Sequence, residues 1–239
     1  MVVDPKLIGI SGKIGNGKDL LCDIINYVIT EDYWTSFEHY MYESRKVDEV
    51  YENKKFASIL KDITGKLIGC HPSQLEDREF KEKELGEEWW YYCNSLFFDG
   101  ETKMVSYLEA DDNIKNNTSW YIVKLTPRKL LQLLGTEAGR HIIHPNIWVN
   151  ALFADYEPDS NWIITDVRFP NEAKAIKEKG GIMIRVNRPQ FMANGRVIVK
   201  DEHESETALD DYDGFDYVIE NDSDSVRDLV DKVRELKIV

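Results

Sequence analysis

The chain has 239 residues, and 42% of them are hydrophobic. This length suits one large domain, or a core domain with insertions, that can fold without disulfides or a structural metal. Its 44 acidic and 30 basic side chains give a formal charge of −14, which argues against a general nucleic-acid-binding protein. A protein this acidic that handles phosphates must gather its few cations at one place or recruit a divalent metal ion.

The cysteines and the hydropathy pattern indicate the cellular compartment in which the protein works. Cys22, Cys70 and Cys93 are odd in number and show no CxxC spacing, which favours reduced thiols over a disulfide framework or a zinc site. No apolar stretch approaches the roughly 20 residues of a membrane helix. The segment Met1–Lys6 lacks the features of a secretory signal. We therefore expect a cytoplasmic protein with no membrane partner.

The first predicted elements are a strand over Leu7–Ile10 and a helix from about Lys18, joined by a glycine-rich turn. The helix shows apolar residues at three- and four-residue spacing. The stretch from Glu31 to about Ser119 is irregular, acidic and aromatic-rich, and we interpret it as an insertion with small packing clusters of its own. Within it, a hairpin is expected over Ser95–Leu108, turned at Asp99-Gly100.

The second half of the chain alternates helices with strands. The predicted elements are a helix from Thr126-Pro127 through Leu134, a helix over Asn146–Tyr156, a strand over Trp162–Thr165, a helix from Pro170 to Gly180, strands over Ile182–Val186 and Tyr217–Ile219, and a final helix containing Val226–Val233. The acidic stretch Gln190–Asp213 is predicted to be a surface loop. Such alternation predicts an α/β fold with a mostly parallel sheet covered by helices on both faces.

A phosphate-binding motif lies between the first predicted strand and helix. Gly12–Lys18 matches G-x-x-x-x-G-K, with further glycine at Gly15 and with Asn16 before the last glycine, Gly17. Glycines let consecutive backbone N–H groups turn towards phosphate oxygens, and the helix that follows adds its positive end. The lysine can then reach the β- and γ-phosphates. We expect this loop to bind a nucleoside triphosphate.

One position departs from the usual motif. Asp19 stands where Ser or Thr normally supplies a hydroxyl group to Mg²⁺. A carboxylate is a suitable ligand for this hard cation, either directly or through water. The departure argues against ordinary GTPases and motor ATPases, and it leaves phosphate binding intact.

Charged residues at the ends of later predicted elements are candidates for the same site. Arg128, Arg168 and Arg188 could pair with phosphate oxygens, although a surface ion pair is the common role of an arginine. Asp166 ends a buried strand, as the magnesium-holding carboxylate of P-loop enzymes does, but it could equally cap the following helix. Glu172 could accept a sugar hydroxyl or complement a helix N-terminus.

Six segments carry short motifs in a defined order. They are the loop Ser11–Asp19, the segment Phe56–Lys61, the element Asp77–Glu79, the helix Arg128–Glu137 with Trp148 downstream, the turn Asp166–Glu172 and the strand end Val186–Pro189. Their order and spacing resemble those of phage-type deoxynucleoside monophosphate kinases, whose loop reads S-G-x-x-x-x-G-K-D. His203–Glu206 is similar to an H-x-x-E element in the lid of these kinases. The resemblance covers nearly the whole chain.

The resemblance implies a P-loop kinase domain over residues 1–239 with an inserted substrate-binding region at 31–120 and a lid-like loop at 190–213. It implies ATP and Mg²⁺ as cofactors and small nucleotides as partners, with no nucleic-acid polymer; a homodimer stays open. The implied catalytic residues are Lys18, Arg128 and Arg168, and the implied metal ligands are Asp19 and Asp166. Cofactor contacts fall on Gly12, Gly15, Asn16, Gly17, Lys18, Asp19 and Arg188. Substrate contacts fall on Ala57, Lys61, Arg78, Arg128, Gly135, Thr136, Arg140, Trp148, Asp166, Arg168 and Glu172.

Some alternatives stay open. Arg140 could bind a substrate phosphate or end a solvated helix, and Trp148 could stack on a base or belong to the core. The loop Gly12–Lys18 also looks like that of dephospho-coenzyme A kinases, and phosphomevalonate kinases share a G-K-D loop. A nucleotide-sensing protein without catalysis would bind ATP through the same residues. The function predicted is phosphorylation of deoxynucleoside monophosphates.

Overall fold

The computed structural model describes residues 5–30, 36–43, 50–94, 103–189 and 203–238. The chain forms two compact units: Met1–Ser58 together with Asn146–Val239, and Ile59–Pro145. The second unit is thus a continuous segment inserted into the first. It begins and ends later than the insertion expected at 31–120. Within the described ranges, no helix is long and apolar enough to cross a membrane.

The first unit is built on a five-stranded sheet in which every pair of neighbours is parallel. The strand order is β2-β6-β1-β7-β8, where the strands are β1 (Leu7–Ser11), β2 (Glu52–Lys54), β6 (Trp162–Ile164), β7 (Ile182–Asn187) and β8 (Tyr217–Glu220). The central strand β1 pairs Leu7 with Trp162 on one side and Ser11 with Arg185 on the other. The predicted α/β class is confirmed.

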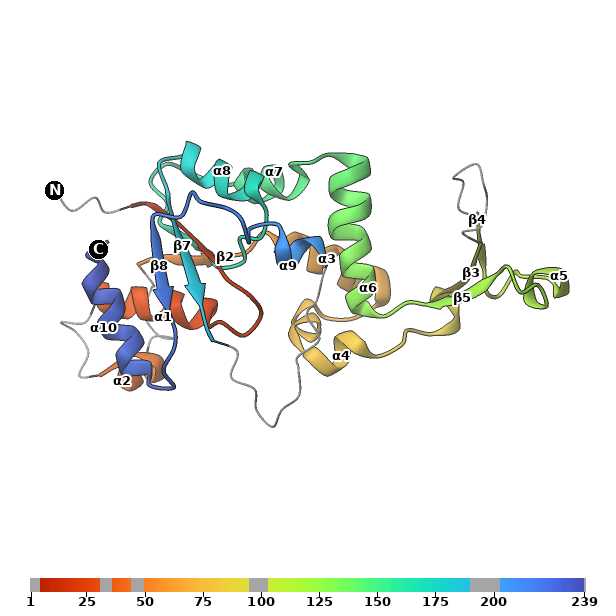
Figure 1. Ribbon diagram of the computed structural model, residues 1–239, viewed down its shortest axis with the longest axis horizontal. Coiled ribbons are helices and arrows are strands. Elements are labelled where there is room, and N and C mark those ends of the chain that lie inside the picture. The colour runs from red at the N-terminus through yellow and green to blue at the C-terminus, as the bar shows by residue number, and fades with distance from the viewer. Residues whose placement is uncertain (1–4, 31–35, 44–49, 95–102, 190–202, 239) are drawn as a thin grey trace. The chain divides into compact units, whose positions relative to one another are not determined.

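Helices cover both faces of this sheet (Figure 1). Ile8 and Ile10 of β1 are fully buried in one cluster with the apolar faces of α1 (Lys18–Ile29) and α10 (Val226–Leu236), and α2 (Phe37–Glu43) joins through Tyr40. Side chains alternate along a strand, so Gly9 faces the other side. There it lies against Ile176 of α8 (Pro170–Glu178), which packs beside α7 (Ile147–Phe153).

The second unit contains a three-stranded antiparallel sheet in the order β4-β3-β5. Its strands are β3 (Trp90–Asn94), β4 (Lys103–Ser106) and β5 (Tyr121–Lys124). Its helical elements are α3 (Ala57–Ile68, which starts in the first unit), η3 (Pro72–Glu76), α4 (Arg78–Glu82), η4 (Glu87–Trp89), α5 (Asp112–Lys115), α6 (Pro127–Gln132) and the π-helix η5 (Leu133–Ile143). Tyr92 and Tyr107 stack at 5.8 Å between ring centroids, and they form part of a small aromatic cluster.

Three expectations for the middle and late parts of the chain need correction. The hairpin exists, but its first strand is β3, earlier than predicted, and the expected turn at Asp99-Gly100 lies outside the described residues. The helix capped by Thr126 becomes a π-helix after Gln132, where His144 N donates to Gly139 O at 2.9 Å. Of the predicted loop 190–213, residues 190–202 lie outside the described ranges, and the remainder contains one helical turn, α9 (Glu204–Thr207).

Candidate functional site

The loop between β1 and α1 has a backbone that only glycine fits well. Gly15 and Gly17 have φ angles of 82° and 91°, in the left-handed region that side chains disfavour. A Cβ atom at Gly12 would lie 2.6 Å from the carbonyl oxygen of Val186. The loop therefore lies tightly against β7 and leads directly into the positive end of α1, which is the arrangement that binds phosphate groups.

Asn16 fixes this loop to its neighbours. Its side-chain amide donates to Val186 O at 2.8 Å, and the side chain of Asn221 donates to Asn16 O at 3.0 Å. Asn16 is only 5% exposed, so its side chain points into the protein. A nucleotide contact at Asn16 would have to come from its backbone.

Lys18 folds back over the loop that precedes it. Its Nζ donates to Gly12 O at 2.8 Å and to Lys13 O at 3.0 Å. Burial lowers the pKa of the Lys18 ammonium to about 8, and the positive charges of Arg168 and Arg185 add to this effect. The ammonium group thus lies at the phosphate loop among other cations.

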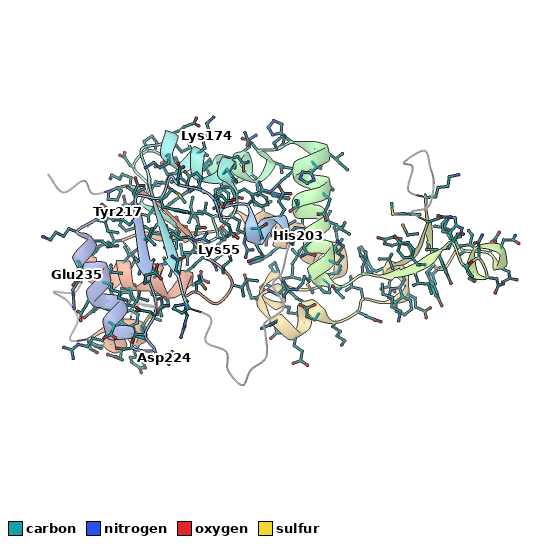
Figure 2. The ribbon with its side chains drawn as sticks, viewed as in Figure 1. Lys55, Lys174, His203, Tyr217, Asp224 and Glu235 are labelled. Carbon is teal, nitrogen blue, oxygen red and sulfur yellow. The ribbon has the colours of Figure 1, made fainter. Side chains whose placement is uncertain are left out.

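Asp19 is an ionised carboxylate beside Lys18. Thr165 Oγ1 donates to Asp19 Oδ1 at 2.8 Å, and Lys55 Nζ lies 2.9 Å from the same oxygen. These hydrogen bonds outweigh the burial that opposes ionisation, so the pKa of Asp19 lies below its usual value. Lys55, labelled in Figure 2, follows β2 and was not predicted as a site residue.

Asp166 caps a helix, although not the one expected. Its two carboxylate oxygens accept the backbone N–H groups of Phe56 at 2.8 Å and Ala57 at 2.9 Å, at the start of α3. The sequence suggested α8, which follows Asp166 directly, as the alternative partner. The carboxylate therefore joins the end of β6 to the segment that begins α3.

Glu172 holds the turn that carries Arg168. Its Oε2 accepts the backbone N–H groups of Arg168 at 2.7 Å and Phe169 at 3.0 Å, and the residue is 1% exposed. This geometry favours the helix N-terminus over a sugar hydroxyl as the partner of Glu172. A buried carboxylate with two such bonds fixes the backbone from which the Arg168 side chain projects.

The Arg168 guanidinium forms an ion pair with Glu206 of α9, and Nη1 also lies 3.4 Å from Ser205 O. Arg168 and Glu206 are 32% and 10% exposed at their side chains. Two further cations, Lys13 and Arg185, form ion pairs with a residue that follows α9. Asp210 lies 2.5 Å from Lys13 Nζ and 3.4 Å from Arg185 Nη2.

Arg188 forms an ion pair at the surface of the structure, and its nucleotide contact stays a prediction. It pairs at 2.8 Å with Asp224, whose side chain is 99% exposed, in the loop before α10 (Figure 2). Lys13 and Arg185 also lie at the loop, and the sequence did not single them out. Arg185 lies between Ile184 and Val186 in a strand whose mostly apolar sequence predicts a core element. Only the pairing of β7 with β1 places Arg185 next to the loop.

The family model of deoxynucleotide monophosphate kinases matches residues 84–233, which is more than half of the chain. The chain belongs to this family. It is 28% identical over 222 residues to the deoxynucleoside-5'-monophosphate kinase of Escherichia phage T5, covering 85% of this chain and 84% of the phage protein. It is 31% identical over 163 residues to an Acanthamoeba polyphaga mimivirus protein that carries a deoxynucleotide monophosphate kinase name, covering 62% of this chain and 79% of that protein.

The match to the kinase family contains Arg128, Asp166, Arg168 and Glu172 but begins after the phosphate loop. The loop Gly12–Asp19 is thus supported by its motif and its backbone geometry. Membership identifies the chain as a kinase that phosphorylates deoxynucleoside monophosphates.

The remaining predicted substrate residues are divided between the units. Ala57 and Trp148 belong to the first unit, where Trp148 is 6% exposed, as a core residue is. In the second unit, Lys61 pairs with Glu76 at 2.5 Å, and Arg128 pairs with Glu82. Arg78 is exposed at the start of α4. Gly135, Thr136 and Arg140 are buried in the π-helix, a conformation that often marks functional sites.

Proposed function

We propose that this kinase uses ATP with Mg²⁺ and transfers the γ-phosphoryl group to the phosphate of a deoxynucleoside monophosphate. The observation that carries the proposal is the loop Gly12–Asp19, where Lys18 crosses the loop beside the ionised Asp19. In this transfer an acceptor phosphate oxygen bonds to the γ-phosphorus while the bond to the β,γ-bridging oxygen breaks, and ADP leaves with that electron pair. The products are ADP and a deoxynucleoside diphosphate.

Catalysis of this reaction consists mainly of alignment and charge neutralisation. In the proposed arrangement the loop amides and Lys18 hold the ATP phosphates. Arg168, held by Glu172 at its backbone, contacts the transferred group and the acceptor phosphate. A guanidinium suits this role because its paired N–H donors match two phosphate oxygens.

The carboxylates at the loop fit a magnesium ion. Asp19 is ionised and its side chain is 65% exposed, so its oxygens can reach a hard cation beside the loop. Asp166 already accepts two backbone N–H groups and would act in the outer coordination sphere. When bound, Mg²⁺ supplies neutralisation of phosphate charge. Within the described residues, no three His, Cys, Asp or Glu side chains gather into a metal-binding group.

The acceptor is tested by measuring ADP release from ATP over the deoxy- and ribonucleoside monophosphates, with phosphomevalonate and dephospho-coenzyme A included. ADP should appear only with nucleoside monophosphates. Release with one of the other two acceptors alone would contradict the proposal. ATP binding without ADP release from any acceptor would identify a nucleotide sensor.

The loop is tested by Lys18→Met, which removes the ammonium and keeps most of the side-chain volume. Turnover should fall by about 10²- to 10³-fold, because a charge that stabilises the transferring group is lost. Lys174→Met on α8, 74% exposed and labelled in Figure 2, is the matched control and should keep full activity. Near-normal turnover of a folded Lys18→Met protein would refute the loop assignment.

A further inference from the structure

Arg185 lies at the start of the phosphate loop because of strand pairing. In the register of β7 with β1, Arg185 is opposite Ser11, the last residue before Gly12. Its Nη1 donates to Ser11 Oγ at 3.1 Å, and its guanidinium lies over the Phe215 ring at 5.6 Å. The side chain is only 14% exposed. The guanidinium is thus held in one place beside the loop.

One carboxylate joins Arg185 to the loop itself. Asp210 lies 3.4 Å from Arg185 Nη2 and 2.5 Å from Nζ of Lys13, a loop residue. Lys13 also donates to Glu206 O at 2.6 Å. A carboxylate shared by two cations presents the same kind of oxygen acceptor that a phosphate group would present. The side chains of Lys13 and Asp210 are 29% and 34% exposed, so solvent reaches this ion pair at the loop.

The local charges favour an anion at this position. Lys13, Lys18, Arg168 and Arg185 gather around one loop in a chain whose net charge is −14. Bringing like charges together is unfavourable, as the repulsion of the Lys18 ammonium by Arg168 and Arg185 shows. Asp210 and Glu206 offset part of this repulsion in the structure. Phosphate groups, with more charge and more acceptor oxygens, would offset more of it.

We propose that Arg185 is a further phosphate-binding residue of the loop, and that Asp210 pairs with Arg185 and Lys13 until nucleotide phosphates replace it. The proposal rests on the proposed nucleotide site. A guanidinium carries five N–H donors, so Arg185 can keep its hydrogen bond to Ser11 and still donate to a phosphate oxygen. Arg188, three residues further on, forms a more exposed pair with Asp224.

The first arm of the test measures ADP binding by calorimetry, with and without Mg²⁺. Arg185→Gln should weaken ADP binding by about tenfold or more, as expected for loss of a charge-assisted bond to phosphate. Arg234→Gln, which makes the same change in an exposed pair with Asp231 on α10, should stay within about twofold of the parent. Arg185→Lys keeps the charge and should recover part of the affinity. Parent-like affinity in a folded Arg185→Gln protein would overturn the proposal.

The second arm of the test removes the carboxylate of Asp210, which competes with phosphates for Arg185 and Lys13. This arm gives a result even if the Arg185→Gln protein fails to fold. Asp210→Asn should tighten ADP binding several-fold, because the phosphates no longer displace an ionised group. Asp211→Asn is the matched control, since Asp211 is exposed and the change in net charge is identical. If Asp210→Asn binds ADP more weakly than the parent, or as tightly as Asp211→Asn does, then phosphates do not replace the Asp210 carboxylate at Arg185 and Lys13. If the parent itself binds no ADP, the proposed nucleotide site fails; if only these variants disagree, this inference alone fails.

Discussion

Lys18 combines two properties that rarely occur together in a lysine. Its ammonium donates to two carbonyl oxygens of its own loop, yet burial and neighbouring arginines make its protonated form less favourable than in water. A bound phosphate would supply the negative charge that this ammonium lacks. Nucleotide binding and protonation of Lys18 should therefore be linked.

This linkage gives a prediction for pH dependence. In the structure the pKa of Lys18 is about 8, and the negative charge of nearby phosphates would raise this pKa in a nucleotide complex. Below pH 8 Lys18 is protonated in both states and binding takes up no proton at this residue. Between the two pKa values the complex binds one more proton, so ADP affinity should fall as pH rises above 8. The nucleotide phosphates, with a second pKa of about 6, do not titrate there.

Calorimetry of ADP binding in two buffers of different ionisation enthalpy measures the proton uptake. We expect uptake to be small at pH 7 and to approach one proton at pH 9. Lys18→Met should remove the uptake together with most of the affinity. Equal uptake in the parent and the Lys18→Met protein would show that another group titrates.

Among the structural elements, α3 depends on a residue far away in the chain. The N–H groups of Phe56, just before the helix, and of Ala57, its first residue, donate to Asp166 just after β6. Asp166→Ala should leave these N–H groups without that acceptor and cost about 1–2 kcal/mol, as loss of a helix cap does. The expected result is faster hydrogen exchange in peptides covering residues 56–60.

The control for this prediction is Asp155→Ala, because Asp155 is exposed between α7 and β6. Hydrogen exchange of residues 56–60 should be unchanged in that protein. If residues 56–60 of the Asp166→Ala protein exchange at the parental rate, the carboxylate does not hold the start of α3.

Elements with strong local signals were predictable from sequence. The loop Gly12–Lys18 and the helices α1 and α10 need only spacing and periodicity, and all lie where expected. The strand β2 could not be found, because Glu52-Asn53-Lys54 is short and polar and its pairing with β6 is purely tertiary. The helix α3 was missed as well; it buries few residues, and Gly65 in its interior lowers its helix propensity.

In the candidate site, too, some residues can be recognised from their neighbours in the sequence, whereas others are brought together only by the fold. Lys18 and Asp19 follow from the motif, and Arg168 follows from its place after a buried strand. The contacts of Lys13 and Arg185 with Asp210 could not be predicted, because they join residues about 200 and 25 positions apart through the sheet. The end of a strand, where Arg188 lies, is a typical ligand position, whereas the interior of a strand, where Arg185 lies, is not.

For the whole molecule, the three cysteines give a simple test of the fold. Cys22 and Cys93 are buried, one in each unit, and Cys70 is partly exposed. Burial also raises the pKa of the Cys70 thiol, which lowers its thiolate fraction at neutral pH. A disulfide-exchange reagent should therefore label about one thiol slowly in the native protein and all three after denaturation. Fast labelling of more than one thiol in the native protein would contradict the burial of Cys22 or Cys93.

The parallel sheet also determines when the protein can fold during its own synthesis. The central strand β1 is made first, but its partners β6 and β7 begin at Trp162 and Ile182. At about 5–20 residues per second, a ribosome needs roughly 8–30 s to add the intervening segment. During that time Ile8 and Ile10 have no sheet to join. The nascent chain, more than the folded protein, thus exposes the apolar residues that favour aggregation.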